Sequence, residues 1–421
     1  GKAGSEYRQL IYQKGFSGRR AEQEVDHLRH FFDNALKALD QSISFNKRDD
    51  RLYHAYNLIK VDGDRIVLRR LYEMLEGQVA VLSSGFLSVE EAVDLLDALK
   101  QSKLFREDQY SYILYPDRDL PFFMDKNIIP KEEVDRSQLL QALIRQSNKE
   151  IILEDVNGIF HFHGDIRNAG ILKKALEELS ESYGTLIQKE RDVILDIYEK
   201  VFDHQSFTGR SGTFYGYEGL GSIYWHMVSK LLLAVSETYF RAVAGGSTPD
   251  MLGKLAAHYY EIRAGIGLNK APEVYGAFPT DPYSHTPRNK GAQQPGMTGQ
   301  VKEDIIARWG ELGLMVRKGS IRFLPALLRR EEFLTSPCDF DFVDLQGHGR
   351  TLKLEKESLA FTYCQIPVIY HLSGKKEIMI HFTDGTAQKM SGLDLGPDNS
   401  MKVFNRDGDI DRLEIYLSPL L

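Results

Sequence analysis

Ionisable side chains gather most densely between His161 and Ala169, where a strand-like stretch is followed by a predicted helix. Alternation in an extended chain points both histidines of this segment, His161 and His163, to the same side as Asp165. The guanidinium of Arg167 and the amide of the next residue then fall within reach of one point near a helix start. Polar groups at such a place stay accessible at the rim of a pocket. Asp165 is therefore a candidate general acid.

The same segment allows two other interpretations. Asp165 is suited to capping the helix that begins near Ala169 and to pairing with Arg167, which would be a purely structural role. A metal site built on the two histidines would need a third ligand, and no residue of suitable spacing supplies one. The sequence leaves the catalytic and the structural roles of Asp165 open, and it implies no metal.

A glycine-rich loop from Thr208 to Gly221 leads directly into an almost wholly apolar helix. Glycines let a backbone approach a ligand closely, as the floor of a pocket requires. Glu218 at the mouth of this helix is costly to bury without partners, which favours a role in a site over one in stabilising the helix dipole. Deeper in the helix, His226 is expected to be a core histidine. The glycine spacing matches neither a Walker loop nor a dinucleotide fingerprint, so no cofactor is implied.

A third candidate region begins at Ala271 and leads through a loop rich in Gly, Pro and Gln to Thr298 and Gln300. Aromatic side chains are interleaved there with carboxylates and amides, as between Glu273 and Tyr283. Such a lining suits a sugar, because the C–H faces of a sugar stack on rings and its hydroxyls bond to charged or amide groups. An irregular surface loop is the alternative interpretation.

The composition excludes several classes of partner. The 421 residues include 53 Lys and Arg against 60 Asp and Glu, a net charge of -7, so no broad basic field exists for nucleic acid. The two cysteines, Cys338 and Cys364, match no zinc-ligand spacing. No apolar run reaches the ~18 residues of a membrane span, and the first residues lack the build of a signal peptide. We expect a soluble protein with no membrane partner. Its compartment stays open, with the cytoplasm favoured.

Two kinds of structure must position these candidate residues. Helical periodicity dominates from Arg20 to about Trp309, and alternation with a period of two follows Arg350. The change predicts a helical domain over residues 1–330 and a β domain over residues 331–421. Strands are expected over 351–354, 359–363, 368–372, 377–382 and 412–417, with a turn at 384–385, and the β domain is expected to be antiparallel.

Local signals predict the individual helices. Ser88 and Glu91 form a capping box at the start of one helix. Apolar residues at helical spacing predict two outer helices, one from Leu172 to Tyr183 and one from Ile194 to Val201. The segment 221–235 leaves almost no polar face, so it should lie inside. Alternating outer and inner helices are what a double-layered helical ring would produce.

Taken in order, these segments resemble the cellobiose phosphorylase-like proteins among the glycoside hydrolases and phosphorylases with six-hairpin, (α/α)6-toroid folds. Residues 164–169 resemble a diverged form of the loop that carries the catalytic Asp in that family. Residues 216–221 are similar to its glycine-rich loop, 273–283 to its Glu/Pro/Tyr loop, and 298–300 to its Thr-Gly segment. In that family, a segment similar to residues 319–328 leads into a small C-terminal β domain.

The resemblance implies a mainly α fold, an α/α toroid of the six-hairpin glycosidase kind followed by a small antiparallel β domain. The candidate helices number about nine or ten, fewer than a closed ring of six hairpins requires. We therefore expect an incomplete ring, and the missing N-terminal part of the same polypeptide becomes an expected partner.

The implied activity is cleavage of glycosidic bonds in β-linked oligosaccharides by an inverting mechanism. Asp165 would protonate the glycosidic oxygen and Glu218 would activate water, with the carboxyls about 6.5–9.5 Å apart. Hydrolysis is favoured over phosphorolysis, because the Thr298 segment lacks the small-residue-then-Trp continuation that the family uses for phosphate. The alternative is a noncatalytic glycan-binding or scaffold fragment. The expected contacts to the oligosaccharide substrate are His163, Arg167, Arg210, Tyr217, Glu273, Tyr275, Thr298 and Gln300.

Overall fold

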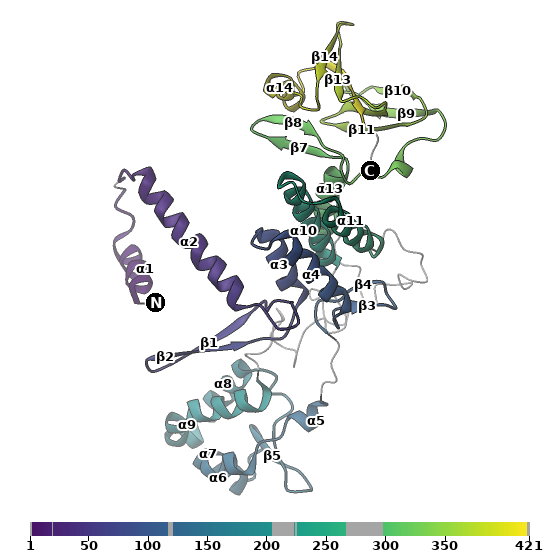
Figure 1. The fold of residues 1–421 in the computed structure, drawn as a ribbon. Coiled ribbons are helices and arrows are strands. Elements are labelled where there is room, and N and C mark those ends of the chain that lie inside the picture. The colour runs from purple at the N-terminus through teal and green to yellow at the C-terminus, as the bar shows by residue number, and fades with distance from the viewer. Residues whose placement is uncertain are drawn as a thin grey trace. The chain divides into compact units, whose positions relative to one another are not determined.

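A computed structural model describes residues 2–18, 20–116, 121–203, 223, 225–266 and 298–418 (Figure 1). Of these residues, 46% are helical and 22% lie in strands, which makes the protein mixed α/β. The predicted mainly α toroid is therefore wrong. The chain divides into two compact units, Gly1–Asp49 and Asp50–Leu421, which are described separately. Among the described residues, no helix combines the length and the apolar character that a bilayer crossing requires.

The first unit consists of two helices without a buried residue, α1 (Lys2–Lys14) and α2 (Val25–Phe45). Apolar side chains of α2 recur at helical spacing and lie exposed, among them Leu28, Phe32 and Leu39.

The second unit begins with a small hairpin and continues into a group of helices around α10. The elements of this group are β1 (Asn57–Asp62), β2 (Arg65–Arg70), α3 (Leu75–Ser84), α4 (Val89–Gln101), β3 (Phe105–Arg106), β4 (Ser111–Tyr112), α10 (Trp225–Ala244), α11 (Pro249–Ala264) and α13 (Thr298–Glu311). Helix α10 packs against α3, α11 and α13 (Figure 1). Its Val228, Leu231 and Val235 are fully buried, which confirms the predicted inner helix. The capping box of Ser88 and Glu91 is also confirmed at the start of α4.

Residues 121–203 form a small group of elements with its own apolar core. The elements are α5 (Phe123–Lys126), α6 (Lys131–Arg136), α7 (Gln138–Arg145), β5 (Ile152–Glu154), β6 (Phe160–Phe162), α8 (Ala169–Glu178) and α9 (Ser180–Phe202). Among the described residues, this core is made of side chains between Ile129 and Phe202. The single helix predicted from Leu172 to Tyr183 is wrong, because α8 ends at Glu178 and Tyr183 has a non-helical backbone, with φ of -128°.

The C-terminal part is built on strands, as the alternation predicted. Its elements are β7 (Leu314–Arg317), β8 (Ser320–Phe323), η3 (Arg330–Glu332), β9 (Cys338–Val343), β10 (Gly349–Leu354), β11 (Ser358–Tyr363), β12 (Ile366–Leu372), β13 (Glu377–Phe382), β14 (Ala387–Ser391), α14 (Pro397–Asn405) and β15 (Ile410–Leu417). A five-stranded sheet has the order β11-β12-β15-β13-β14. The expected all-antiparallel arrangement is wrong, because β15 pairs in parallel with β12. Helix α14 separates β14 from β15 in the chain and allows β15 to enter the middle of the sheet.

Candidate functional site

The segment from His161 to Ala169 covers the end of β6, a turn and the first residue of α8. Strand β6 ends at Phe162, so the expected alternation stops before Asp165. The ring of His161 is buried, with Nδ1 against the Asn127 carbonyl and Nε2 3.4 Å from Asp155 Oδ2. His161 and Phe162 are therefore both buried, and the buried His161 does not share one open side of the segment with the exposed Asp165.

The side chain of Asp165 is 85% exposed and lies near His163. The Asp165 amide donates a hydrogen bond to His163 Nδ1 at 3.2 Å, and Asp165 Oδ2 lies 3.8 Å from the same nitrogen. The residue that caps α8 is Asn168, whose Oδ1 accepts a hydrogen bond from the Ile171 amide at 3.0 Å. The structural role considered for Asp165 as a cap is therefore wrong. Its catalytic role stays a prediction.

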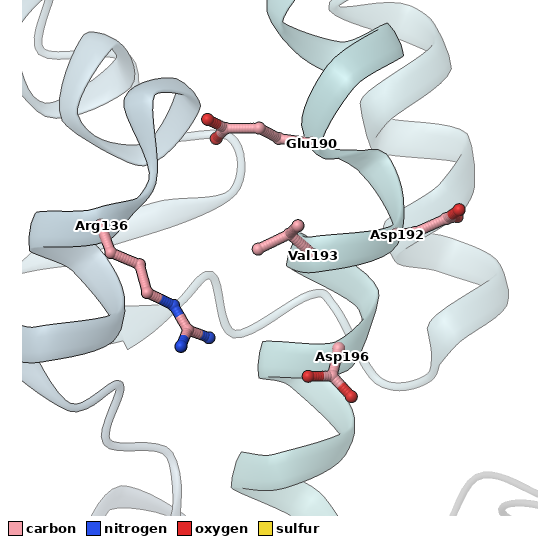
Figure 2. Close-up of a pocket in the computed structure, with 5 residues that line it drawn as sticks. All are labelled: Arg136, Glu190, Asp192, Val193 and Asp196. Atoms are coloured by element: carbon pink, nitrogen blue, oxygen red, sulfur yellow. The ribbon is translucent and has the colours of Figure 1, made fainter. Parts of the chain in front are cut away.

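A pocket of about 510 Å³ lies between α6 and α9 in the same group of elements. Figure 2 shows Arg136 on one side and Glu190, Val193 and Asp196 along one face of α9. The pocket is open, and its lining is mostly charged. Asp192 is the remaining lining residue.

Glu190, which sequence reasoning did not single out, caps α7 from a distance. Its carboxylate accepts hydrogen bonds from Ser137 Oγ at 2.6 Å and from the amides of Gln138 and Leu139 at 3.0 Å each. Partial burial raises the pKa of Glu190, but the hydrogen bonds outweigh it, so the pKa of Glu190 is lowered. Glu190 therefore holds α7 and α9 together as an ionised group.

Helices α10 and α13, which follow the second and third candidate regions in the chain, pack against each other. His226 Nε2 lies 3.4 Å from Glu303 Oε1 near the start of both helices. Further along both, Gly310 approaches Ser236 so closely that a Cβ would lie 2.8 Å from Ser236 Oγ. Residue numbers at the contacts increase along both helices in the same direction, so α10 and α13 run parallel. The helices consequently begin at the same end, at residues 225 and 298, where the chain arrives from the second and third candidate regions.

Glu303 is a further candidate that sequence reasoning missed. The residue is 4% exposed, and its Oε2 is buried without a hydrogen-bond partner in the part of the chain that the structure describes. His226 and Lys302 Nζ, at 3.7 Å, both face Oε1 instead. An unbonded buried carboxylate oxygen is costly and is a mark of functional sites. His226 itself is part-buried rather than a core histidine.

The second predicted catalytic residue, Glu218, lies outside the described residues, as do the predicted contacts Arg210, Tyr217, Glu273 and Tyr275. Thr298 and Gln300 fall in the first turn of α13, where the structure describes the backbone alone. Arg167 is exposed, and within the described residues it makes no ion pair with Asp165. No group of three or more His, Cys, Asp or Glu side chains among the described residues is arranged to hold a metal.

Residues 120–205 match a family model described as GH149 phosphorylase insertion domain 2. The match covers the elements from α5 to α9, and it includes His163, Asp165 and Arg167. The comparison with curated proteins gives no match. The expected kinship to glycoside phosphorylases is thereby supported at the level of a GH149-type family, without extending to the toroid or to the cellobiose phosphorylase-like proteins in particular.

Proposed function

We propose that this chain takes part in cleaving β-linked oligosaccharides as part of a glycoside phosphorylase. The observation that carries the proposal is the match of residues 120–205 to insertion domain 2 of GH149 phosphorylases. Sequence reasoning favoured hydrolysis, whereas the name of the matching family favours phosphorolysis. In phosphorolysis a phosphate oxygen attacks the anomeric carbon, the bond to the leaving sugar breaks, and the leaving oxygen takes a proton from a general acid.

The predicted roles of individual residues carry over into this proposal. Asp165 supplies the proton, and in a hydrolytic reaction Glu218 would activate water on the opposite face of the sugar. The parallel packing of α10 and α13 supports a site at their common end, because the segment of Glu218 precedes α10 in the chain and Thr298 begins α13. Glu303 lies near this end, and its buried Oε2, which has no hydrogen-bond partner among the described residues, supports a functional role for the region.

A second candidate function is glycan binding without catalysis. The exposure of Asp165 favours it, because a side chain that is 85% exposed in a turn has the environment of an ordinary solvated carboxylate. A general acid usually works in a site that excludes bulk water, and an exposed turn does not provide such a site.

The test is an assay of the whole chain with neutral β-linked gluco-oligosaccharides, with and without inorganic phosphate. We expect sugar 1-phosphate to form only with phosphate, and Asp165→Asn to remove turnover while oligosaccharide binding stays measurable. Asp125→Asn, which changes an exposed carboxylate in the same matched segment, is the control. Release of reducing sugar without phosphate would show hydrolysis instead. Binding without turnover in both buffers would favour the second function, and undiminished turnover in Asp165→Asn would refute its acid role.

A further inference from the structure

An open pocket of about 500 Å³ lies between α10, α13 and β7, away from the residues assigned so far. Its volume is within the roughly 300–1,000 Å³ typical of small-molecule sites. One face of α10 contributes Glu237 and Phe240, α13 contributes Ile306 and Trp309, and β7 contributes Arg317. Glu237 follows His226 by eleven residues, or about 16 Å along the helix, so this pocket is separate from the common helix end.

Trp309 gives the pocket a flat aromatic wall. The residue is 43% exposed, which leaves a large part of its indole open to solvent. Its ring meets Tyr363 of β11 edge-on, with centroids 5.8 Å apart and planes at 89°. Next to it, Gly310 lets α13 approach Ser236 of α10 closely, and both residues line the pocket. The indole is thus held in place by a perpendicular contact with the Tyr363 ring.

Two charged groups of opposite sign border this aromatic wall. Within the described residues, neither Glu237 nor Arg317 has a hydrogen-bond or ion-pair partner, although both line the pocket. Arg241, by contrast, is already bound to the Leu82 carbonyl and to Thr238. The pocket therefore offers one free acceptor group and one free donor group beside an exposed ring.

We propose that this pocket is a carbohydrate-binding subsite for one pyranose unit of a neutral β-linked oligosaccharide. A pyranose presents C–H groups that stack on an indole, and hydroxyls that donate to the Glu237 carboxylate and accept from the Arg317 guanidinium. The opposite charges suit a neutral polyhydroxylated ligand better than an acidic or a basic one. The inference rests on the proposed carbohydrate function and adds a second place of contact to it.

The two tryptophans of the chain make a direct test possible. In a Trp225→Phe protein, Trp309 is the sole source of tryptophan fluorescence. Titration with a neutral β-linked gluco-oligosaccharide should then give a saturable change in its emission. By calorimetry on the otherwise wild-type chain, Trp309→Ala and Glu237→Gln should each weaken binding tenfold or more, whereas Trp309→Phe should retain most of it. Tyr12→Ala, which removes an aromatic side chain that is 84% exposed on α1, should leave binding unchanged.

The outcomes separate this inference from the proposed function. The chain could bind or turn over oligosaccharide while the Trp309 emission stays constant and Trp309→Ala keeps the wild-type affinity. That result would overturn the subsite and leave the proposed function standing. No turnover and no binding in the wild-type chain would overturn both. The chain could instead self-associate in a way that Trp309→Ala abolishes, while its Trp309 emission does not respond to sugar. That result would identify the pocket as a contact between copies of the chain and would also overturn the subsite.

Discussion

At the scale of single residues, Glu190 shows how one carboxylate supports the matched segment. A group whose folded pKa is depressed contributes stability above its unfolded pKa, and this contribution is lost as the pH falls through the folded pKa. The lowered pKa of Glu190 therefore predicts stabilisation of α7 at neutral pH that disappears in strong acid. The cause is the set of hydrogen bonds from Ser137, Gln138 and Leu139 to the ionised carboxylate.

Glu190→Gln tests this prediction. An amide nitrogen cannot accept these hydrogen bonds, so the variant should lose about 1–2 kcal/mol of unfolding free energy at neutral pH. The difference from wild type should vanish in strongly acidic buffer, where both side chains are neutral. Thermal unfolding followed by circular dichroism across pH gives the measurement. Asp192→Asn, on the same helix, should stay within about 0.5 kcal/mol of wild type. A Glu190→Gln deficit that persists unchanged in acid would contradict the role of the charge.

Residue roles that depend on near neighbours could be predicted, and those that depend on distant ones could not. Ser88 and Glu91 are three positions apart, so their capping box is written in the local sequence. Ser137 and Glu190 are 53 positions apart, and no spacing rule connects them. The same holds for His226 and Glu303, which meet only because α10 and α13 pack side by side. A local pattern singled out Asp165. Its exposure, however, depends on the end of β6 at Phe162, which places Asp165 in a turn.

At the scale of elements, Gly313 joins α13 to β7. Its amide donates to the Gly310 carbonyl at 2.9 Å, and its carbonyl accepts from the Leu324 amide at 2.7 Å. The backbone has φ of 70°, in the left-handed region that favours glycine at a helix end. A Cβ at this position would overlap the backbone of Leu324 and Pro325, which cannot move as a side chain would.

Gly313→Ala should therefore destabilise the protein by more than about 3 kcal/mol, because backbone strain adds to the overlap. Chemical denaturation followed by tryptophan fluorescence measures the change near α13. Gly253→Ala is the matched control, since Gly253 is an exposed position within α11 with nothing within 4 Å of a new Cβ. That variant should gain about 0.5–1 kcal/mol from better helix propensity. Equal stability of the two variants would show that the connection tolerates a side chain.

Element types were easier to predict than element partners. Alternation in the sequence located β10 to β13 and β15. In β13, buried residues alternate with partly buried ones, whereas β12 is buried over its first five residues. The parallel pairing of β12 with β15 depends on a connection through α14, which the alternation does not encode. The toroid failed for the same reason. Helical periodicity indicates which face of a helix is buried, but a ring requires a particular set of neighbours for every helix.

At the scale of the molecule, the cores around α9 and around β15 are made of separate stretches of chain. One draws on residues between Ile129 and Phe202, and the other on residues between Leu312 and Leu417. A self-contained core is what an inserted domain needs to fold without disturbing its host. The match of residues 120–205 to an insertion domain fits this division.

Reciprocal core substitutions test whether the two cores open independently. Ile197 in α9 and Ile378 in β13 are both completely buried, so replacing either with Ala should cost about 3 kcal/mol. In native-state hydrogen exchange, Ile197→Ala should reduce protection of amides between residues 129 and 202 while those of β12 and β15 keep theirs. Ile378→Ala should give the opposite pattern. If either variant reduced protection in both cores equally, the chain from Asp50 onward would unfold as one cooperative unit, and an insertion that folds on its own account would be excluded.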